Sequence, residues 1–190
     1  MNKKKIVVAV TGASGAIYAS ILFEKIQLLN KQIEDCCVVF SDNAKEVWKY
    51  ELKDATYENI PFKVFANNDF YAPFASGSAN YECIIICPCS MGTLGRIASG
   101  VSNDLITRAA DVMLKERKKL ILITREMPLN LVHINNMKAV TEAGGIICPA
   151  SPSFYSHPAN TKEMLSTVID KVLNLAGFEI TGIKWGDEKK

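Results

Sequence analysis

The fold is decided by residues 5–16, which read Lys5-Ile6-Val7-Val8-Ala9-Val10-Thr11-Gly12-Ala13-Ser14-Gly15-Ala16. The apolar, β-branched run at the start is typical of a strand that is buried on both faces. The small residues that follow it predict a tight turn into a helix. A strand that leads directly into a helix in this way predicts a βαβ unit and therefore a parallel sheet.

The rest of the chain repeats this alternation. Short apolar strands are predicted at Lys5–Val10, Asp35–Phe40, Glu82–Cys87, Leu120–Thr124 and Gly145–Cys148. Helices are predicted at Ala16–Asn30, Asn43–Leu52, Thr93–Ala98, Asp104–Arg117, Leu131–Ala143 and Lys162–Ala176. We therefore expect an α/β fold, a three-layer Rossmann-like or flavodoxin-like parallel sheet with helices on both faces. It forms one domain over residues 1–190, with a C-terminal tail at 177–190.

One long connection, residues 53–80, interrupts the pattern. It has little periodicity, although Phe62–Phe65 is a candidate short edge strand. Loops of this length in compact domains are usually functional or disordered. Its aromatic side chains argue against disorder and for burial, against another subunit for example. These aromatic residues are Phe62, Phe65, Phe70, Tyr71 and Phe74.

Composition and charge exclude several classes of protein. The 190 residues carry a formal net charge of only +2, which gives no reason to expect nucleic acid or an anionic membrane as a partner. No apolar run reaches the roughly 18 residues that span a bilayer. The first apolar segment is too short for a signal peptide, so we expect a cytoplasmic protein.

The six cysteines are interpreted as structural. Cys36, Cys37, Cys83 and Cys148 lie in strand-like runs, where a thiol packs as a small hydrophobe. The segment Cys87–Cys89 has C-x-C spacing, which is not that of a zinc site, and no metal is expected. A reducing compartment agrees with this interpretation.

Small and polar residues follow several of the strands. In an open α/β sheet, ligands bind beyond the carboxyl ends of the strands, so these residues are expected to share one crevice. Gly12–Gly15 precedes a helix and favours an anion site, with a simple tight turn as the alternative. Only two of its glycines fit the dinucleotide pattern G-x-G-x-x-G, which is therefore incomplete.

Two serines after later strands also have two interpretations. Ser41 can bind a polar ligand group or cap the helix that follows it. Ser90 and Thr93, with the amide of Gly92, form a second candidate anion cradle, and an ordinary strand-to-helix turn is the alternative. An NAD site needs an acid near Ser41 for the ribose, and Asp42 is the residue available.

Several charged residues are candidates for chemistry. Glu126 follows Arg125 at the end of a strand, where a carboxylate can act as an acid or base. Glu51 is a second acid, although an isolated helical acid is more often structural. Tyr155 lies on a loop after a strand and can donate to a phosphate. Both histidines are interpreted as structural.

A charged stripe runs along the helix predicted at 104–117. Asp104, Arg108, Asp111 and Lys115 recur at a spacing of three to four residues, opposite an apolar face. From this spacing alone, the stripe is interpreted as a solvated helix face with ion pairs.

Together these segments resemble the UbiX-type flavin prenyltransferases, a family within the homo-oligomeric flavin-containing decarboxylase-like fold. The resemblance covers nearly the whole chain. It rests on 11–16, 75–78, 87–90, 107–112, 114–117, 125–129, 154–155 and 184–186. Several motifs in matching order are far more specific than any one of them.

The resemblance implies a reaction in which reduced FMN is joined at N5 and C6 to the dimethylallyl group of dimethylallyl phosphate. It also implies that the product, prenylated FMN, serves a UbiD-type decarboxylase, and that the protein assembles as a dodecamer with shared sites. By matching position, FMN would be held by Gly12, Ala13, Ser14, Ser41, Ser90, Met91, Gly92, Thr93 and Arg125.

The resemblance assigns further residues to the donor and to catalysis. The donor would be surrounded by Arg108, Lys115, Tyr155 and Lys171, and enclosed by Ser76, Gly77, Ser78 and Trp185. Catalysis would involve Glu126 and Glu51 in proton transfer, Ser14 as a relay near N5, and Lys115 on the leaving phosphate. Trp185 would shield an allylic cation. The family often has Arg where Lys171 stands, and Lys keeps the charge but loses the bidentate fork.

Two alternatives remain. An FMN-dependent decarboxylase of the cysteine type shares the fold, but such enzymes have a histidine after the second strand, and residues 41–54 contain none. The second alternative is a non-catalytic flavin-binding subunit, which differs from the enzyme only in that it has no turnover of its own. A nucleotide-dependent reductase is disfavoured by the missing third glycine.

Overall fold

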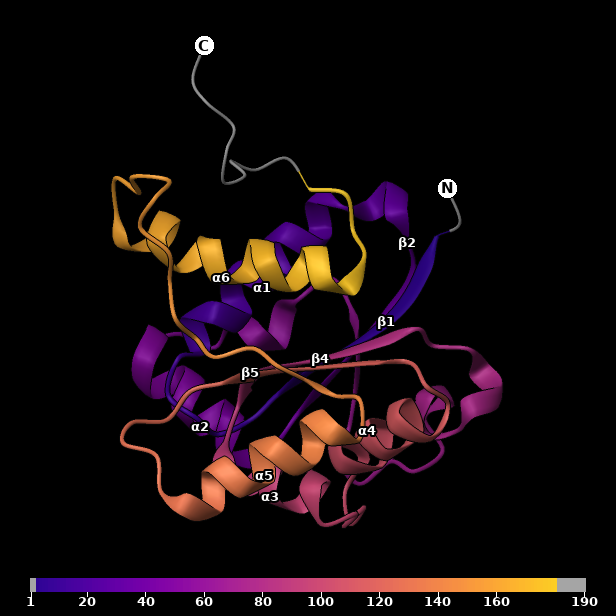
Figure 1. The fold of residues 1–190 in the computed structure, drawn as a ribbon. Coiled ribbons are helices and arrows are strands. Elements are labelled where there is room, and N and C mark those ends of the chain that lie inside the picture. Colours follow the sequence, from indigo (N-terminus) through magenta and orange to yellow (C-terminus); the bar gives the residue numbers. More distant parts are fainter. Residues whose placement is uncertain (1–2, 181–190) are drawn as a thin grey trace.

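A computed structural model describes residues 3–180 of the chain as an α/β fold (Figure 1). Trp185 and residues 181–190 of the predicted tail lie outside the described residues. Six strands form one parallel sheet in the order β3-β2-β1-β4-β5-β6. They are β1 (Lys4–Val10), β2 (Ile33–Phe40), β3 (Lys63–Phe65), β4 (Cys83–Cys89), β5 (Lys119–Thr124) and β6 (Ile146–Ile147).

The predicted strands are confirmed, and their ends differ from the predicted ones by no more than two residues. The central strand β1 pairs with β2 and β4, so that Val8 lies opposite Val38 on one side and Ile85 on the other. Val8 is fully buried because helices cover both faces of the sheet. This burial explains why the strand sequences are continuously apolar.

Within the described residues, six α-helices form the two outer layers, and they confirm the predicted three-layer arrangement (Figure 1). They are α1 (Ala16–Leu28), α2 (Asp42–Leu52), α3 (Met91–Ala98), α4 (Leu105–Lys115), α5 (Leu131–Glu142) and α6 (Thr161–Ala176). Helices α1, α2 and α6 pack on one face, against Val8 and its same-face neighbours. Helices α3, α4 and α5 pack on the other, against Val7 and Ala9.

The charged stripe predicted along 104–117 needs one correction. Asp104 does not lie on the helix face, because it is the N-cap of α4 and its Oδ1 accepts from the Thr107 amide at 2.8 Å. Its carboxylate also pairs with Arg96. Arg108 and Asp111 do form an ion pair on the helix surface, with 2.9 Å between Nη1 and Oδ2. The spacing rule therefore holds for the helix interior and fails at its first turn, where capping decides the backbone.

The long connection at 53–80 is ordered by three short 3-10 turns, η2 (Thr56–Asn59), η3 (Pro73–Ala75) and η4 (Gly77–Ala79), together with β3. Within the single chain, its aromatic side chains differ in burial. Phe74 is fully buried, whereas Phe70 is 46% exposed and Tyr71 is 100% exposed in the single chain. Tyr71 therefore contributes no packing within this chain.

The cysteines lie mostly in the interior. Five of them are buried, Cys148 is half-buried, and all six are free thiols. Among residues 3–180, no group of three or more His, Cys, Asp or Glu side chains is arranged to hold a metal ion. No helix in the same range has the length and apolar character needed to cross a membrane.

Candidate active site

The N-terminus of α1 is occupied by a carboxylate of the same chain. Oε2 of Glu51 accepts from the amides of Gly15 at 2.9 Å and Ala16 at 2.8 Å, and Oε1 accepts from Gly15 at 3.1 Å. Gly15 is the N-cap and has a φ of 113°, which favours glycine. The anion site predicted at these amides is therefore filled by Glu51, and Glu51 is not the isolated helical acid that its sequence context indicates.

The surroundings of Glu51 fix its charge. Partial burial raises the pKa of its carboxyl, but hydrogen bonds from the Ser14 side chain and from the amides of Gly15 and Ala16, with the charge of Arg125, lower it overall. The positive end of the α1 dipole acts in the same direction. Glu51 is therefore ionised at neutral pH, and it is the acceptor for the hydroxyl of Ser14.

Arg125 joins the same group from a third element. It follows β5 directly, and its Nε donates to the carbonyl oxygen of Ser14 at 3.1 Å. Ser14, Glu51 and Arg125 thus come from the β1–α1 loop, the last turn of α2 and the end of β5. They meet where the carboxyl ends of the strands lie, which is called the carboxyl edge below. Glu126 is exposed beside this group, and its Oε1 accepts from the Met127 amide at 3.1 Å.

The loop between β1 and α1 lies against the start of α2. A Cβ on Gly12 would lie 2.6 Å from the Cβ of Asn43, so this position accepts no side chain without a shift. Ala13 is buried. Ser41 caps α2 by accepting from the Ala44 amide at 3.2 Å, which agrees with the capping interpretation of this serine.

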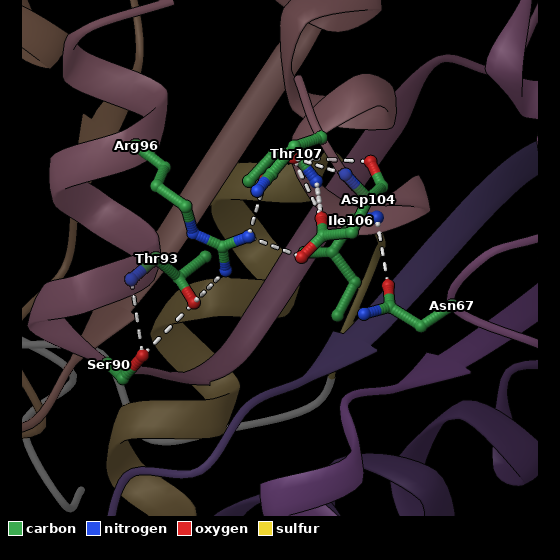
Figure 2. A network of polar contacts seen from close by, with 8 residues as sticks. Asn67, Ser90, Thr93, Arg96, Asp104, Ile106 and Thr107 are labelled. Carbon is green, nitrogen blue, oxygen red and sulfur yellow. Dashed lines mark hydrogen bonds and ion pairs between the residues drawn. The ribbon is translucent and has the colours of Figure 1, made fainter. Parts of the chain in front are cut away.

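Ser90 lies beside the same loop. Its amide donates to Oγ1 of Thr11 at 2.8 Å, and Thr11 in turn donates to the carbonyl oxygen of Pro88 at 2.8 Å. Ser90 also caps α3, because its Oγ accepts from the Thr93 amide at 3.3 Å (Figure 2). No atom lies within 4 Å of a Cβ built on Gly92, so the first turn of α3 has open space beside it.

These features fit a flavin mononucleotide. A phosphate or carbonyl oxygen needs donors, and the carboxyl edge offers the Ser90 hydroxyl, the Arg125 guanidinium and the first turn of α3. Open space beside Gly92 lets a ligand approach the backbone there, whereas the corresponding side of Gly12 is filled by Asn43. Met91 is buried and Thr93 is 3% exposed, so they support this surface from below.

Five of the residues predicted to bind or enclose the donor form a separate group on α4 and the turns before it. Nε of Arg108 donates to the Ala75 carbonyl oxygen at 3.1 Å, and the hydroxyls of Ser76 and Ser78 lie 3.1 Å apart. The side chain of Glu116 packs directly against Gly77. Glu116 also pairs with Lys115, with 2.5 Å between Nζ and Oε1. We call Ser76, Gly77, Ser78, Arg108 and Lys115 the α4 group.

The α4 group is separated from the carboxyl edge within one chain. Lys115 ends α4, and β5 begins at Lys119, so Lys115 lies near the amino ends of the strands. Arg125 follows the opposite end of β5. Six residues of strand span about 20 Å. A single copy of the chain therefore does not bring Lys115 together with Arg125 and Ser14.

Tyr155 and Lys171 lie on the other face of the sheet. Tyr155 is on the loop after β6, which is tied to the carboxyl edge because the amide of Ala150 donates to the Thr124 carbonyl oxygen at 2.9 Å. Lys171 is exposed on α6. Burial raises the pKa of the Cys148 thiol, and the charge of Lys171 opposes that rise, so the lysine ammonium lies near the end of β6.

Two polar residues of this region were missed by the sequence reasoning. Thr11 joins β1 to β4, and Arg96 joins Thr93 to Asp104 through its two guanidinium nitrogens. Arg96 stands three residues after Thr93 on α3, and this spacing was the available signal. Asp104 lies beyond the end of α3, so the sequence pattern of that helix does not indicate its pairing with Arg96. This pairing is visible only in the structure.

Comparison with known proteins agrees with a flavin-binding α/β domain. The family model described as Flavoprotein matches residues 1–176. The flavin prenyltransferase UbiX of Methanocaldococcus jannaschii is 40% identical over 186 residues, which cover 96% of this chain and 98% of that protein.

Solved structures give the same result. The crystal structure of AnUbiX (PadA1) in complex with FMN and dimethylallyl pyrophosphate has a TM-score of 0.86 and 36% identity, and the match covers 96% of this chain and 100% of that chain. A dodecameric FMN-dependent UbiX-like decarboxylase from Escherichia coli O157:H7 has a TM-score of 0.85 and 35% identity, over 93% of this chain and 95% of that one.

These matches define a class and then a family. The class is that of FMN-binding α/β flavoproteins. Within it, the chain belongs to the UbiX family of flavin prenyltransferases, as its motifs predict. It is therefore a prenyltransferase, and FMN is its flavin. The peptidyl-cysteine decarboxylase EpiD, with 17% identity and a TM-score of 0.60, shares only the fold.

Proposed function

We propose that this protein transfers the dimethylallyl group of dimethylallyl phosphate to N5 and C6 of reduced FMN, forming prenylated FMN. The observation that carries this proposal is the meeting of Ser14, Glu51 and Arg125 at the carboxyl edge. It provides a hydroxyl, an ionised carboxylate and a cation beside the predicted flavin surface. A relative bound to FMN and dimethylallyl pyrophosphate supports the choice of donor class, and the monophosphate is the form that we propose here.

FMN would be held along the carboxyl edge by backbone and side-chain donors. Reduced FMN supplies the nucleophilic N5 and C6 atoms. The residues that would contact it are Gly12, Ala13, Ser14, Ser41, Ser90, Met91, Gly92, Thr93 and Arg125. Arg125 already donates to the Ser14 carbonyl oxygen, so its guanidinium is held over the β1–α1 loop and does not have to be ordered when FMN binds.

Proton transfer is assigned to Ser14, Glu51 and Glu126. The Ser14 hydroxyl donates to the ionised Glu51 carboxylate, so a proton released near Ser14 Oγ has an acceptor in place. Glu126 is exposed next to Arg125, where it can accept a second proton from the reacting region. Lys115 is assigned to the departing phosphate, because a cation stabilises the charge that grows there.

Donor binding requires a second copy of the chain. Arg108 and Lys115 lie in the α4 group, away from the carboxyl edge of the same chain. A homododecamer, the state named for the UbiX-like protein of Escherichia coli, would bring the α4 group of one copy to the carboxyl edge of another. Exposed apolar side chains around α5 support such burial, since Met127 is 85%, Leu131 69% and Val132 63% exposed in the single chain.

The remaining donor contacts are assigned to Tyr155 and Lys171, with Ser76, Gly77, Ser78 and Trp185 enclosing the allylic group. Lys171 provides a charge without a bidentate fork. We treat residues 1–190 as one flavin-binding domain that acts in the cytoplasm. The partner that consumes the product would be a UbiD-type decarboxylase.

The proposal is tested by anaerobic incubation of the protein with reduced FMN and dimethylallyl phosphate, followed by mass analysis of the extracted flavin. A flavin heavier by one C5H8 unit is the expected product, and dimethylallyl pyrophosphate is run in parallel to compare the two donors. A matched control is Glu24→Gln, which removes an exposed carboxylate of α1 and leaves the product yield unchanged. Unmodified FMN after incubation with either donor would contradict the proposed reaction.

A further inference from the structure

Arg96 connects the cap of α4 to a hydroxyl in α3 (Figure 2). Its Nη1 donates to Oδ2 of Asp104 at 2.5 Å and to Oδ1 of Asn103 at 2.9 Å. Its Nη2 donates to Oγ1 of Thr93 at 3.4 Å. Asp104 is itself fixed, since its Oδ1 accepts from the amide and the hydroxyl of Thr107. The guanidinium is therefore held in one orientation, with a nitrogen directed at Thr93.

This contact sets the direction of the next hydrogen bond. A guanidinium has no acceptor, so Oγ1 of Thr93 must accept from Arg96. Thr93 is 3% exposed, and within residues 3–180 its hydroxyl forms hydrogen bonds only with Arg96 and with Oγ of Ser90, which lies 3.0 Å away. A buried hydroxyl proton needs an acceptor. The Thr93 hydroxyl therefore donates to Ser90.

These hydrogen bonds also decide the direction of the Ser90 hydroxyl proton. Its Oγ accepts from both the hydroxyl and the backbone amide of Thr93, which fills its two lone pairs. The proton of Ser90 Oγ is consequently directed away from Thr93. The amide of Ser90 is tied to Thr11, the residue that leads into the loop at Gly12–Gly15. The Ser90 hydroxyl is thus a donor with a fixed direction beside the predicted flavin surface.

We infer that Arg96 is a positioning residue that keeps Ser90 as a hydrogen-bond donor toward an oxygen or nitrogen acceptor of bound FMN. The inference rests on the proposed function, because it requires FMN at the carboxyl edge. Arg96 acts through Thr93 and Ser90 and does not touch the flavin. With the opposite direction of the bonds, Ser90 would donate to Thr93 and present a lone pair to the acceptors of FMN.

The test is a double-mutant cycle on FMN affinity, measured by quenching of flavin fluorescence. Arg96→Met is expected to weaken FMN binding by about fivefold, the order of one ordinary hydrogen bond. Ser90→Ala is expected to weaken it at least as much. Adding Arg96→Met to Ser90→Ala changes the affinity no further, because no serine hydroxyl remains to be oriented. Arg96→Lys keeps a donor for Thr93 and recovers part of the affinity.

A merely structural role for Arg96 gives a different pattern. Equal weakening by Arg96→Met with and without the Ser90 hydroxyl would overturn the inference, as would an unchanged affinity in the single variant. Urea unfolding midpoints identify a variant that does not fold. If Arg96→Met does not fold, Arg96→Lys completes the same cycle. A parent protein that binds no FMN contradicts the proposed function, whereas FMN binding without coupling contradicts only the role of Arg96.

Discussion

The carboxylate of Glu51 accepts hydrogen bonds from the amide of Gly15 at 2.9 and 3.1 Å, and so joins the last turn of α2 to the first turn of α1. A carboxylate in this position satisfies amides that have no partner within their own helix, and the helix dipole stabilises its charge. Glu51 is thereby fixed both in place and in protonation state. This arrangement makes it a structural anchor as well as the proposed proton acceptor.

Replacing Glu51 by Gln is expected to lower the free energy of unfolding by about 1–2 kcal/mol at pH 7, since charged hydrogen bonds to helix amides are lost. The pKa of Glu51 in the folded protein lies below its ordinary value of 4.5, so its stabilisation is present above that value and is lost as the pH falls through the folded-state pKa. Urea unfolding of parent and variant between pH 7 and pH 3 measures the difference, which should shrink in acid.

Glu46 provides the matched control, because it is an exposed acid on the same helix. Glu46→Gln should change the unfolding free energy by less than about 0.5 kcal/mol. A Glu51→Gln variant whose stability differs from the parent by the same amount at pH 3 and pH 7 would show that the ionised carboxylate is not the stabilising group.

Gly12 and Gly92 make a second matched pair. A Cβ on Gly12 would lie 2.6 Å from the Cβ of Asn43, whereas one on Gly92 would meet nothing within 4 Å. Gly12→Ala should therefore cost about 1–3 kcal/mol of unfolding free energy. Gly92→Ala, in the first turn of α3, should leave the stability equal or slightly higher. Equal thermal midpoints for the two variants would contradict the close packing at Gly12.

The fold can be predicted from the sequence because the patterns that indicate each strand and helix are local. A run such as Lys5–Val10, followed by small residues and then an amphipathic helix, identifies a βα unit from within about twenty residues. Right-handed crossovers then limit the ways in which such units combine. Helix ends such as the one at Asp104 are harder to predict, because a capping side chain and a helical side chain have similar spacing.

The geometry of the site is harder to predict, because it depends on contacts between residues far apart in the sequence. The pairing of Glu51 with Gly15 and Ala16 joins residues 35 or 36 positions apart, and its isolated position in α2 indicated a structural acid. The spacing of Arg96 from Thr93 on α3 is visible in the sequence, but its contact with Asp104 is not. The resemblance assigns Ser14, Glu51 and Arg125 to one site, and the structure brings these three residues together. It does not indicate that Lys115 lies at the other end of β5 in the same chain.

Removing the proposed catalytic groups should separate binding from chemistry. Glu126→Gln and Lys115→Ala are each expected to retain bound FMN and to lower the prenylation rate by at least about a hundredfold, because they remove a proton acceptor and a charge at the leaving group. Anaerobic assays followed by mass analysis measure the rate, and the absorbance spectrum measures bound flavin. Lys31→Ala, an exposed lysine between α1 and β2, is the control. Rates equal to the parent would refute the assigned roles.

Sharing of the site between copies predicts complementation. Coexpression of Glu126→Gln with Lys115→Ala should restore about a quarter of the parent activity, because random mixing leaves that share of sites with Glu126 from one copy and Lys115 from another. A double variant carrying both changes in every copy is the negative control. If the coexpressed protein is no more active than either variant alone, Lys115 does not act across a subunit boundary.

The most direct measurement is a crystal structure of the assembled protein soaked with FMN and dimethylallyl phosphate. The flavin should lie at the carboxyl edge, with Ser14, Ser90 and Arg125 in contact with it, and the phosphate should contact Lys115 from a neighbouring copy. A flavin bound away from these residues, or a phosphate with no lysine from a second copy beside it, would contradict the proposed site.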